Sequence, residues 1–308
     1  MDYLFLVVAL TLIVVGAMLL TDGSVALARR MHIPEFIVGL TVVAVGTSMP
    51  EMAVSMVSAV EGYGDMAIGN VVGSNIANTL LILGMCAIFS PILFTKSNVR
   101  RDVPMNLWVS LVLLLVAFTS ASINRIEGVL LLVAYVAMII YSIRNDRKTM
   151  TESKVADVKG VSGLRIGAWV IAGLAGLIYG GDLFVTSATN IAKAWGVSEA
   201  VIAISLVAVG TSLPELAASL ASIFKGSPSI ALGNIIGSNI ANILLILGAC
   251  STVTPLVMNC VSMTDIYVVV ATAVILLLSA LFIGDRRITR VEGILFLLVY
   301  VAYIYTLI

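Results

Sequence analysis

Long apolar stretches alternate with short polar segments along the whole chain. Each stretch holds about the 20 largely apolar residues that a helix needs to cross ~30 Å of hydrocarbon. We expect a transmembrane helix at each of ten stretches: 3–21, 36–60, 66–90, 104–122, 126–143, 164–190, 199–224, 229–255, 264–283 and 290–307. The first follows Asp2 rather than Lys or Arg and lacks a cleavage site, so we expect a retained helix, not a signal peptide. The pattern predicts an all-α membrane protein.

Composition narrows the possible functions. The 308 residues are 60% hydrophobic and 11% charged, which excludes a soluble globular enzyme. Lys and Arg together number 17, as do Asp and Glu, so no basic excess is available to bind nucleic acid. The three cysteines have no Cys-x-x-Cys spacing and there is one histidine, which argues against a disulfide scaffold or a zinc cage. We expect no cofactor and no obligatory protein partner besides the lipid bilayer.

The positive charges predict the orientation. With ten crossings the connecting loops form two alternating sets, and all but Arg125 and Lys193 of the 17 Lys and Arg residues fall in one set. Short cytoplasmic loops retain an excess of Lys and Arg. We therefore expect a multi-pass protein of the cell (inner) membrane of a prokaryote, with both termini outside the cytoplasm.

One strongly polar stretch divides the chain. Residues 144–163 are rich in Asp, Glu, Lys, Ser and Thr, as expected of a cytoplasmic linker. The predicted organisation is a five-helix repeat at 1–143, this linker, and a second five-helix repeat at 164–308.

The two halves share a sequence repeat. Residues 37–84 align without a gap on 201–248, at an offset of 164, with 26 of 48 positions identical. VAVGTSMPE at 43–51 matches VAVGTSLPE at 207–215, and GNVVGSNIAN at 69–78 matches GNIIGSNIAN at 233–242. Because each half has an odd number of crossings, the second copy enters the membrane from the opposite side. Two inverted five-helix repeats with broken helices at the ion site are the architecture of secondary transporters.

Glu51 and Glu215 lie at the middle of these apolar helices. An acidic side chain there costs about 2.5–3.5 kcal/mol on insertion scales. None of the ten segments contains an internal Lys or Arg that could pair with them. The two glutamates therefore call for cations from solution, or for protons.

Helical spacing supplies further oxygen ligands. Hydroxyl groups three and four residues before each glutamate share its helix face, namely those of Thr47, Ser48, Thr211 and Ser212. Pro50 and Pro214 should break the helices near Gly46 and Gly210 and free backbone carbonyls.

The second motif adds hydroxyl and amide groups one turn apart, which we expect to be ligands: Ser74, Asn78, Ser238 and Asn242. Interhelical hydrogen bonding and cation contact are equally open for four further amides, those of Asn70, Asn75, Asn234 and Asn239. The motif glycines at 69, 73, 233 and 237 predict close helix packing. Because every candidate ligand is an oxygen, the site suits hard cations such as Na⁺ and Ca²⁺.

These motifs resemble the cation/Ca²⁺ exchanger superfamily, specifically its prokaryotic Na⁺/Ca²⁺ exchangers with two alpha-repeats. The resemblance implies a Na⁺/Ca²⁺ antiporter whose first and sixth helices slide against the rest. It also implies that the ion sites are lined by Thr47, Ser48, Glu51, Ser74, Asn78, Thr211, Ser212, Glu215 and Ser238, with the carbonyls of Ala44 and Ala208. Several such exchangers, including those that co-transport K⁺, carry Asp where this chain has Asn242. We therefore expect exchange that does not depend on K⁺.

Two other functions compete with this prediction. A Ca²⁺/H⁺ antiporter would use the same buried glutamates, since they can take up protons as well as cations. An intramembrane protease is suggested by GVSG at 160–163, but this segment lies in the polar linker and the single histidine is on another loop.

Overall fold

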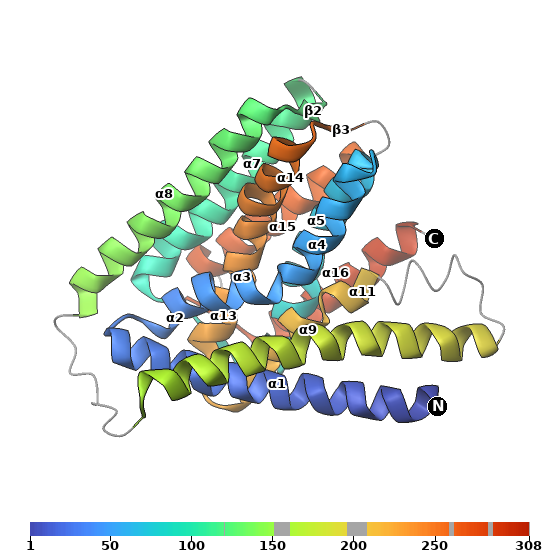
Figure 1. The fold of residues 1–308 in the computed structure, drawn as a ribbon. Helices are drawn as coiled ribbons and strands as arrows, with labels where there is room; N and C mark the ends of the chain where they lie inside the picture. Colours follow the sequence, from blue (N-terminus) through green and yellow to red (C-terminus); the bar gives the residue numbers. More distant parts are fainter. Residues whose placement is uncertain (120, 151–160, 196–207, 259–261, 283–285, 308) are drawn as a thin grey trace.

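The part of the chain that the structure describes is built from long apolar helices. A computed structural model describes residues 1–119, 121–150, 161–195, 208–258, 262–282 and 286–307 (Figure 1). Eight helical segments there are long and apolar enough to span a membrane: α1 (Asp2–Met31), α5–η2–α6 (Gly64–Phe89), η3–α7 (Asn98–Thr119), α8 (Arg125–Met150), α9 (Gly163–Ala194), α13–η5–α14 (Pro228–Val253), α15 (Met263–Phe282) and α16 (Arg290–Leu307). A bent pair, Glu35–Thr47 with Met49–Val60, brings the number to as many as nine.

The seventh expected segment, 199–224, lies partly outside the described residues. Its described part consists of α11 (Ala208–Thr211) and α12 (Leu213–Phe224). The helices differ in length from the predicted segments, since α8 continues past residue 143 to Met150 and α1 continues past residue 21 to Met31. Arg, Lys and Met favour helical structure, so a polar composition alone does not end a helix.

The helices of the two sequence motifs form the core. In the Pro228–Val253 segment 94% of the most apolar 18-residue stretch is buried, whereas in α16 the buried share of the corresponding stretch is 17%. Gly64–Phe89 is similarly enclosed, at 78%. In the other six long helices at most 39% of the corresponding stretch is buried, so the motif side chains lie in the interior of the bundle.

The two longest helices, α1 and α9, lie side by side along the lower edge of the bundle in Figure 1. Their backbones approach closely at small residues. A Cβ added at Gly16 would lie 2.9 Å from the carbonyl oxygen of Gly173, and one at Gly173 would lie 2.5 Å from the Leu20 nitrogen. Small residues at a helix interface permit this contact in a bilayer, so α1 and α9 form a tightly packed pair.

The first broken helix bends at Ser48. The helical run α2–η1–α3 (Glu35–Thr47) meets α4 (Met49–Val60) at 46°. Ser48 adopts a non-helical φ of −82° and ψ of 10°, and Ser212 has nearly the same values, −88° and 3°. The break lies two residues after the expected positions, Gly46 and Gly210. Proline is tolerated in the first turn of a helix, so a new helix begins just before each proline.

The two repeats also match in details that no helix count predicts. η2 (Ala77–Ile82) and η5 (Asn242–Ile246) are π-helical segments at equivalent places within the two core helices. Two residues after the ends of α4 and α12 comes a glycine with positive φ, Gly62 at 87° and Gly226 at 76°. Glycine adopts this left-handed conformation without the penalty that a Cβ brings.

Two short antiparallel ribbons join the repeats. β1 (Ile92–Leu93) pairs with β4 (Arg287–Ile288), and β2 (Ser122–Ile123) pairs with β3 (Leu256–Val257). β1 and β3 lie 164 residues apart, at equivalent positions of the repeats. However, β1 comes before the spanning segment η3–α7 in the chain. The partner of β3, strand β2, comes after that segment. Equivalent strands therefore lie at opposite ends of this helix.

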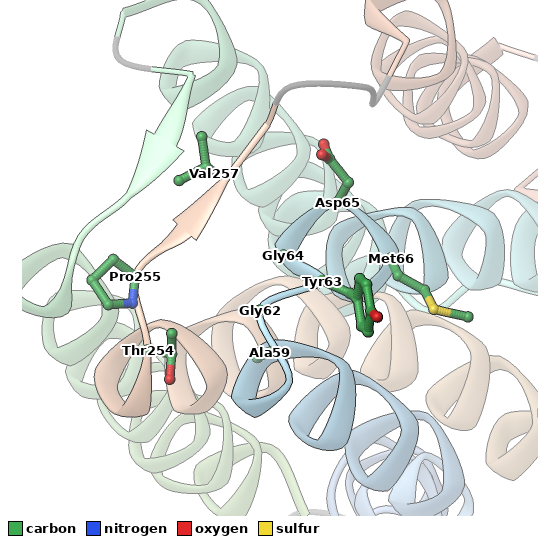
Figure 2. Close-up of a pocket in the computed structure, with 9 residues that line it drawn as sticks. All are labelled: Ala59, Gly62, Tyr63, Gly64, Asp65, Met66, Thr254, Pro255 and Val257. Carbon is green, nitrogen blue, oxygen red and sulfur yellow. The ribbon is translucent and has the colours of Figure 1, made fainter.

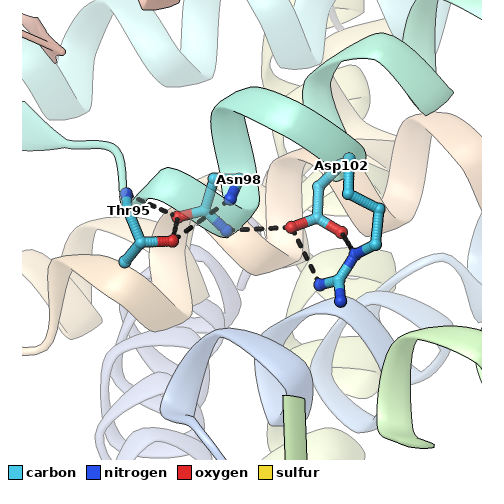
Figure 3. A network of polar contacts seen from close by, with 4 residues as sticks. Thr95, Asn98 and Asp102 are labelled. Atoms are coloured by element: carbon cyan, nitrogen blue, oxygen red, sulfur yellow. Dashed lines mark hydrogen bonds and ion pairs between the residues drawn. The ribbon is translucent and has the colours of Figure 1, made fainter. Parts of the chain in front are cut away.

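A buried ion pair lies at the start of this spanning segment, in η3 (Asn98–Asp102) (Figure 3). Arg101 Nε donates to Asp102 Oδ1 at 2.7 Å, and Asn98 Nδ2 donates to Asp102 Oδ2 at 3.0 Å. Asn98 Oδ1 in turn accepts from the backbone nitrogen and the hydroxyl of Thr95. Asp102 is 1% exposed, so these donors compensate a charge that water does not reach.

Candidate cation site

Glu51 and Glu215 lie in the first turns of α4 and α12, directly after the two helix breaks. Both are 1% exposed. Ser48, the residue at the first helix break, contacts Glu215 and so connects the two glutamate-bearing helices. The positive end of a helix dipole favours a negative charge at this position, so the break that follows from Pro50 and Pro214 also helps to hold each carboxylate.

A serine from the opposite repeat holds each carboxylate. Ser48 Oγ donates to Glu215 Oε1 at 2.8 Å, and Ser212 Oγ donates to Glu51 Oε1 at 3.5 Å. Helical spacing predicted that each serine would share a face with the glutamate of its own helix. In the structure the hydroxyl groups of both serines hydrogen-bond across the interface between the repeats, to the glutamate of the other repeat.

The second oxygen of each carboxylate is left without a partner. Neither Glu51 Oε2 nor Glu215 Oε2 has a hydrogen-bond partner among the described residues. Within that part of the chain, no Lys or Arg forms an ion pair with either glutamate. Burying an uncompensated carboxylate is costly, so the oxygens are available to an ion from solution.

The core helices contribute buried hydroxyl and amide groups, one of which connects to the carboxylate pair. Ser48 Oγ also shares a hydrogen bond of 3.1 Å with Ser238 Oγ, which joins α13 to the carboxylate pair. Asn78 is 1% exposed, and neither Nδ2 nor Oδ1 has a partner among the described residues. Asn242 Oδ1 is also unpartnered, and Ser74 is 5% exposed. Asn78 and Asn242 lie in the two π-helical segments, a geometry that recurs at functional sites.

The remaining predicted ligands lie at the helix breaks. Thr47 Oγ1 donates to Asn234 Oδ1 at 3.2 Å, and the Ala44 carbonyl accepts from the Ser48 nitrogen at 3.1 Å. Thr47 Oγ1 also lies 3.5 Å from this carbonyl oxygen, so an ion bound there would compete with the hydroxyl group. Ala208 and Thr211 are the first and last residues of α11, and Thr211 is half-buried.

The four amides for which two roles were open all make interhelical hydrogen bonds. Asn70 Nδ2 donates to Ser55 Oγ at 2.9 Å, and Asn234 Nδ2 donates to Ser219 Oγ at 3.0 Å. Asn75 and Asn239 form bonds between the two core helices. Sequence reasoning missed Ser55 and Ser219, although both lie one turn after a glutamate and are identical in the two repeats.

The motif glycines behave differently in the two halves. A Cβ at Gly233 would collide with the Phe36 carbonyl, and one at Gly237 would lie 2.5 Å from the Leu40 carbonyl oxygen, which confirms close packing there. A Cβ added at Gly69 or at Gly73 would have no described atom within 4 Å. The segment equivalent to Phe36 and Leu40 in the other repeat is 200–204, which lies outside the described residues.

The ligand chemistry fits hard cations. No group of three or more His, Cys, Asp or Glu residues that could hold a metal occurs within the described residues. The cluster offers carboxylate, hydroxyl, amide and carbonyl oxygens instead, the ligands that Na⁺ and Ca²⁺ prefer. Two carboxylates give it a formal charge of −2, which one Ca²⁺ neutralises.

A surface cavity of about 330 Å³ lies away from these carboxylates, between the turn that joins α4 to α5 and the β3 strand (Figure 2). Tyr63 and Asp65 line it from the first repeat, and Thr254 and Val257 line it from the second. Because Asp65 is its only charged lining residue, the cavity does not match the predicted cation site.

The chain matches the model of the sodium/calcium exchanger protein family over residues 1–144 and 166–308. The chain belongs to this family. It is 38% identical to the putative antiporter CaxA of Alkalimonas amylolytica, over 99% of this chain and 98% of the relative. It is 29% identical to the sodium/calcium exchanger MaX1 of Methanosarcina acetivorans, over 99% and 98% of the two chains.

A solved structure of the sodium-calcium exchanger NCX_Mj, soaked with zero Na⁺ and Ca²⁺, has the same fold with a TM-score of 0.88. The two chains are 32% identical, and the match covers 100% of this chain and 99% of the other. Members of the exchanger family are transporters rather than enzymes. Family membership and the fold support cation/Ca²⁺ exchange through a multi-pass membrane protein.

Proposed function

We propose that this member of the exchanger family is a secondary antiporter that exchanges Na⁺ for Ca²⁺ by alternating access and does not require K⁺. The observation that carries the proposal is the pair of buried glutamates, Glu51 and Glu215. Each is held by a serine of the opposite repeat, and each has one oxygen with no partner among the described residues.

The proposed ion ligands are the oxygens that gather around this pair. They come from Ala44, Thr47, Ser48, Glu51, Ser74, Asn78, Ala208, Thr211, Ser212, Glu215, Ser238 and Asn242. Ca²⁺ and Na⁺ use the same oxygens, so occupation by one excludes the other. An empty pair of buried anions is costly to enclose, and this cost couples the two ion movements.

The proposed topology has ten helices in two inverted five-helix repeats, at 1–143 and 164–308, joined by a cytoplasmic linker at 144–163. Equivalent strands β1 and β3 at opposite ends of the η3–α7 helix support the inversion. The distribution of Lys and Arg supports termini outside the cytoplasm in a prokaryotic inner membrane.

The proposed movement is a shift of α1 and α9 together against the other helices. The glycine contacts between them support their movement as one unit, because separating them would expose closely packed backbone. Such a shift opens the carboxylate pair to one side of the membrane at a time.

Transport in reconstituted vesicles tests the proposal. Vesicles loaded with Na⁺ and diluted into Na⁺-free medium with Ca²⁺ should accumulate Ca²⁺ against its gradient, equally with and without K⁺. Glu51→Gln should abolish this uptake, because a neutral side chain halves the formal charge of the site. Glu61→Gln, which alters an exposed glutamate in a loop, is the control and should leave uptake unchanged.

Two outcomes would replace the proposal. A strict requirement for K⁺ would contradict the argument from Asn242. A pH gradient that drives Ca²⁺ uptake in the absence of Na⁺ would identify the chain as a Ca²⁺/H⁺ antiporter, since protons neutralise buried glutamates as cations do.

A further inference from the structure

The amide of Asn242 has to present one particular end to a cation. An amide carries an oxygen that accepts and a nitrogen that only donates, so a rotation of 180° replaces a cation ligand by a group that repels the cation. A carboxylate at this position would present an oxygen in either orientation, because both of its terminal atoms are acceptors. Asn242 is 1% exposed, so water does not compensate an amide turned the wrong way.

The structure contains a chain of hydrogen bonds that decides this orientation. Asn75 Nδ2 donates to the backbone carbonyl of Asn239 at 3.2 Å. Because a carbonyl oxygen can only accept, the nitrogen end of the Asn75 amide has to face it. Asn75 Oδ1 is then turned toward Asn242 and accepts from Asn242 Nδ2 at 3.0 Å. The polarity of one backbone carbonyl is thereby transmitted through Asn75 to Asn242.

The oxygen end of the Asn242 amide is the end left for an ion. Its Oδ1 is buried and has no partner among the described residues. One helical turn earlier, Ser238 Oγ shares a hydrogen bond with Ser48 Oγ, which donates its proton to Glu215. Residues four apart share a helix face, so Asn242 lies on the face that meets the carboxylate pair.

The equivalent bond in the other half is not made. By the offset of 164 it would join Asn78 Nδ2 to Asn239 Oδ1, and both atoms lack a partner among the described residues. Asn239 Nδ2 donates instead to Thr79 Oγ1 at 2.9 Å, a hydroxyl that the second repeat replaces with Ile243. Among the described residues the site is therefore asymmetric, because the amide of Asn242 is held there and that of Asn78 is not.

We propose that Asn75 is a positioning residue for cation exchange, which holds the amide of Asn242 so that only its oxygen is left for the ion. The inference rests on the proposed function. Both the nitrogen and the oxygen of the Asn75 amide take part in these two hydrogen bonds, so Asn75 acts on the ion through Asn242.

Kinetics of Na⁺-driven Ca²⁺ uptake in vesicles test this role. Asn75→Ala leaves the Asn242 amide without its acceptor and free to turn. We expect the KM for Ca²⁺ to rise roughly tenfold to hundredfold, with little change in the maximal rate. This range corresponds to the free-energy cost of leaving a buried hydrogen-bond donor without an acceptor. Asn75→Leu removes the same polar atoms without leaving a cavity, and should act in the same way if the alanine variant does not fold.

Two comparisons separate positioning from general loosening of the core. Asn239→Ala removes the equivalent side chain of the other repeat, which holds Thr79, and should leave the KM unchanged. In an Asn242→Asp background, Asn75→Ala should shift the KM less than about threefold, because a carboxylate needs no orientation.

Three results would overturn the inference: an unchanged KM in Asn75→Ala and Asn75→Leu, an equal rise in Asn239→Ala, or an equal rise in the Asn242→Asp background. If the unmodified protein takes up no Ca²⁺ under a Na⁺ gradient, the proposed function fails as well. Normal uptake by the unmodified protein with any of the three results leaves the proposed function standing and removes only the role of Asn75.

Discussion

Replacing Glu215 by Gln should weaken ion binding and stabilise the ion-free protein at the same time. Gln keeps the size of the side chain and an oxygen that accepts from Ser48, which now lies 2.8 Å from Glu215 Oε1. The substitution removes one of two negative charges. A substitution that only damaged packing would lower both binding and stability.

The magnitude follows from the burial of the site. A pair of unit charges 4 Å apart interacts with about 4 kcal/mol at the effective dielectric constant of a protein, and a divalent ion doubles this. Part of that gain offsets the desolvation of the carboxylate. Taking about 4 kcal/mol as the net loss, the affinity for Ca²⁺ should fall roughly a thousandfold. Without ions, the variant no longer buries a charge beside Glu51, so its unfolding temperature should rise.

Thermal unfolding of the detergent-solubilised protein measures both effects. Ca²⁺ should raise the unfolding temperature of the unmodified protein, because a ligand that binds only the folded state stabilises it, and should not raise that of Glu215→Gln. Glu61→Gln at an exposed position should keep the full response to Ca²⁺. A variant that is less stable without ions, or that Ca²⁺ stabilises as strongly as the unmodified protein, would refute the reasoning.

Two further predictions concern the scaffold. Gly173→Ala should lower the unfolding temperature and slow transport, because its Cβ would lie 2.5 Å from the Leu20 nitrogen and has to separate α1 from α9. Overpacking of this kind costs about 1–3 kcal/mol; Gly167→Ala, on the same helix and with no described atom within 4 Å, should be neutral. Asp102→Ala should cost about 3–5 kcal/mol of the free energy of unfolding, because it leaves buried Arg101 without its carboxylate. Asp22→Ala breaks an ion pair whose carboxylate side chain is 50% exposed, and should cost at most about 1 kcal/mol in the same denaturation assay. Equal losses in Gly173→Ala and Gly167→Ala would contradict the argument from helix packing. Equal losses in Asp102→Ala and Asp22→Ala would contradict the argument from burial of the ion pair.

Much of the site could be predicted because its signals are local in the sequence. An unpaired glutamate in an apolar stretch and a proline one residue before it are readable from neighbouring residues. The breaks at Ser48 and Ser212 follow from Pro50 and Pro214 to within two residues. The repeat at an offset of 164 then related the two glutamates to each other without any coordinates.

The interaction partners of the site residues could not be predicted as well from the sequence. Helical spacing placed Ser48 on the helix face of Glu51, but it did not predict that Ser48 hydrogen-bonds to Glu215 of the other repeat. Spacing also left two roles open for Asn75, which hydrogen bonds to Asn239 and Asn242 decide. No pattern in the first repeat indicates that Asn78 lacks the hydrogen bond that its counterpart makes, since the two motifs are nearly identical.

The sequence by itself determined the membrane as solvent, the apolar helices, the duplication and the residues that carry charge into the lipid, because each of these depends on residues close together in the chain. Only the tertiary structure decided which oxygens face one another and which remain free. Those contacts join residues about 160 positions apart, and their geometry depends on the bend of each helix and on the way the two repeats pack.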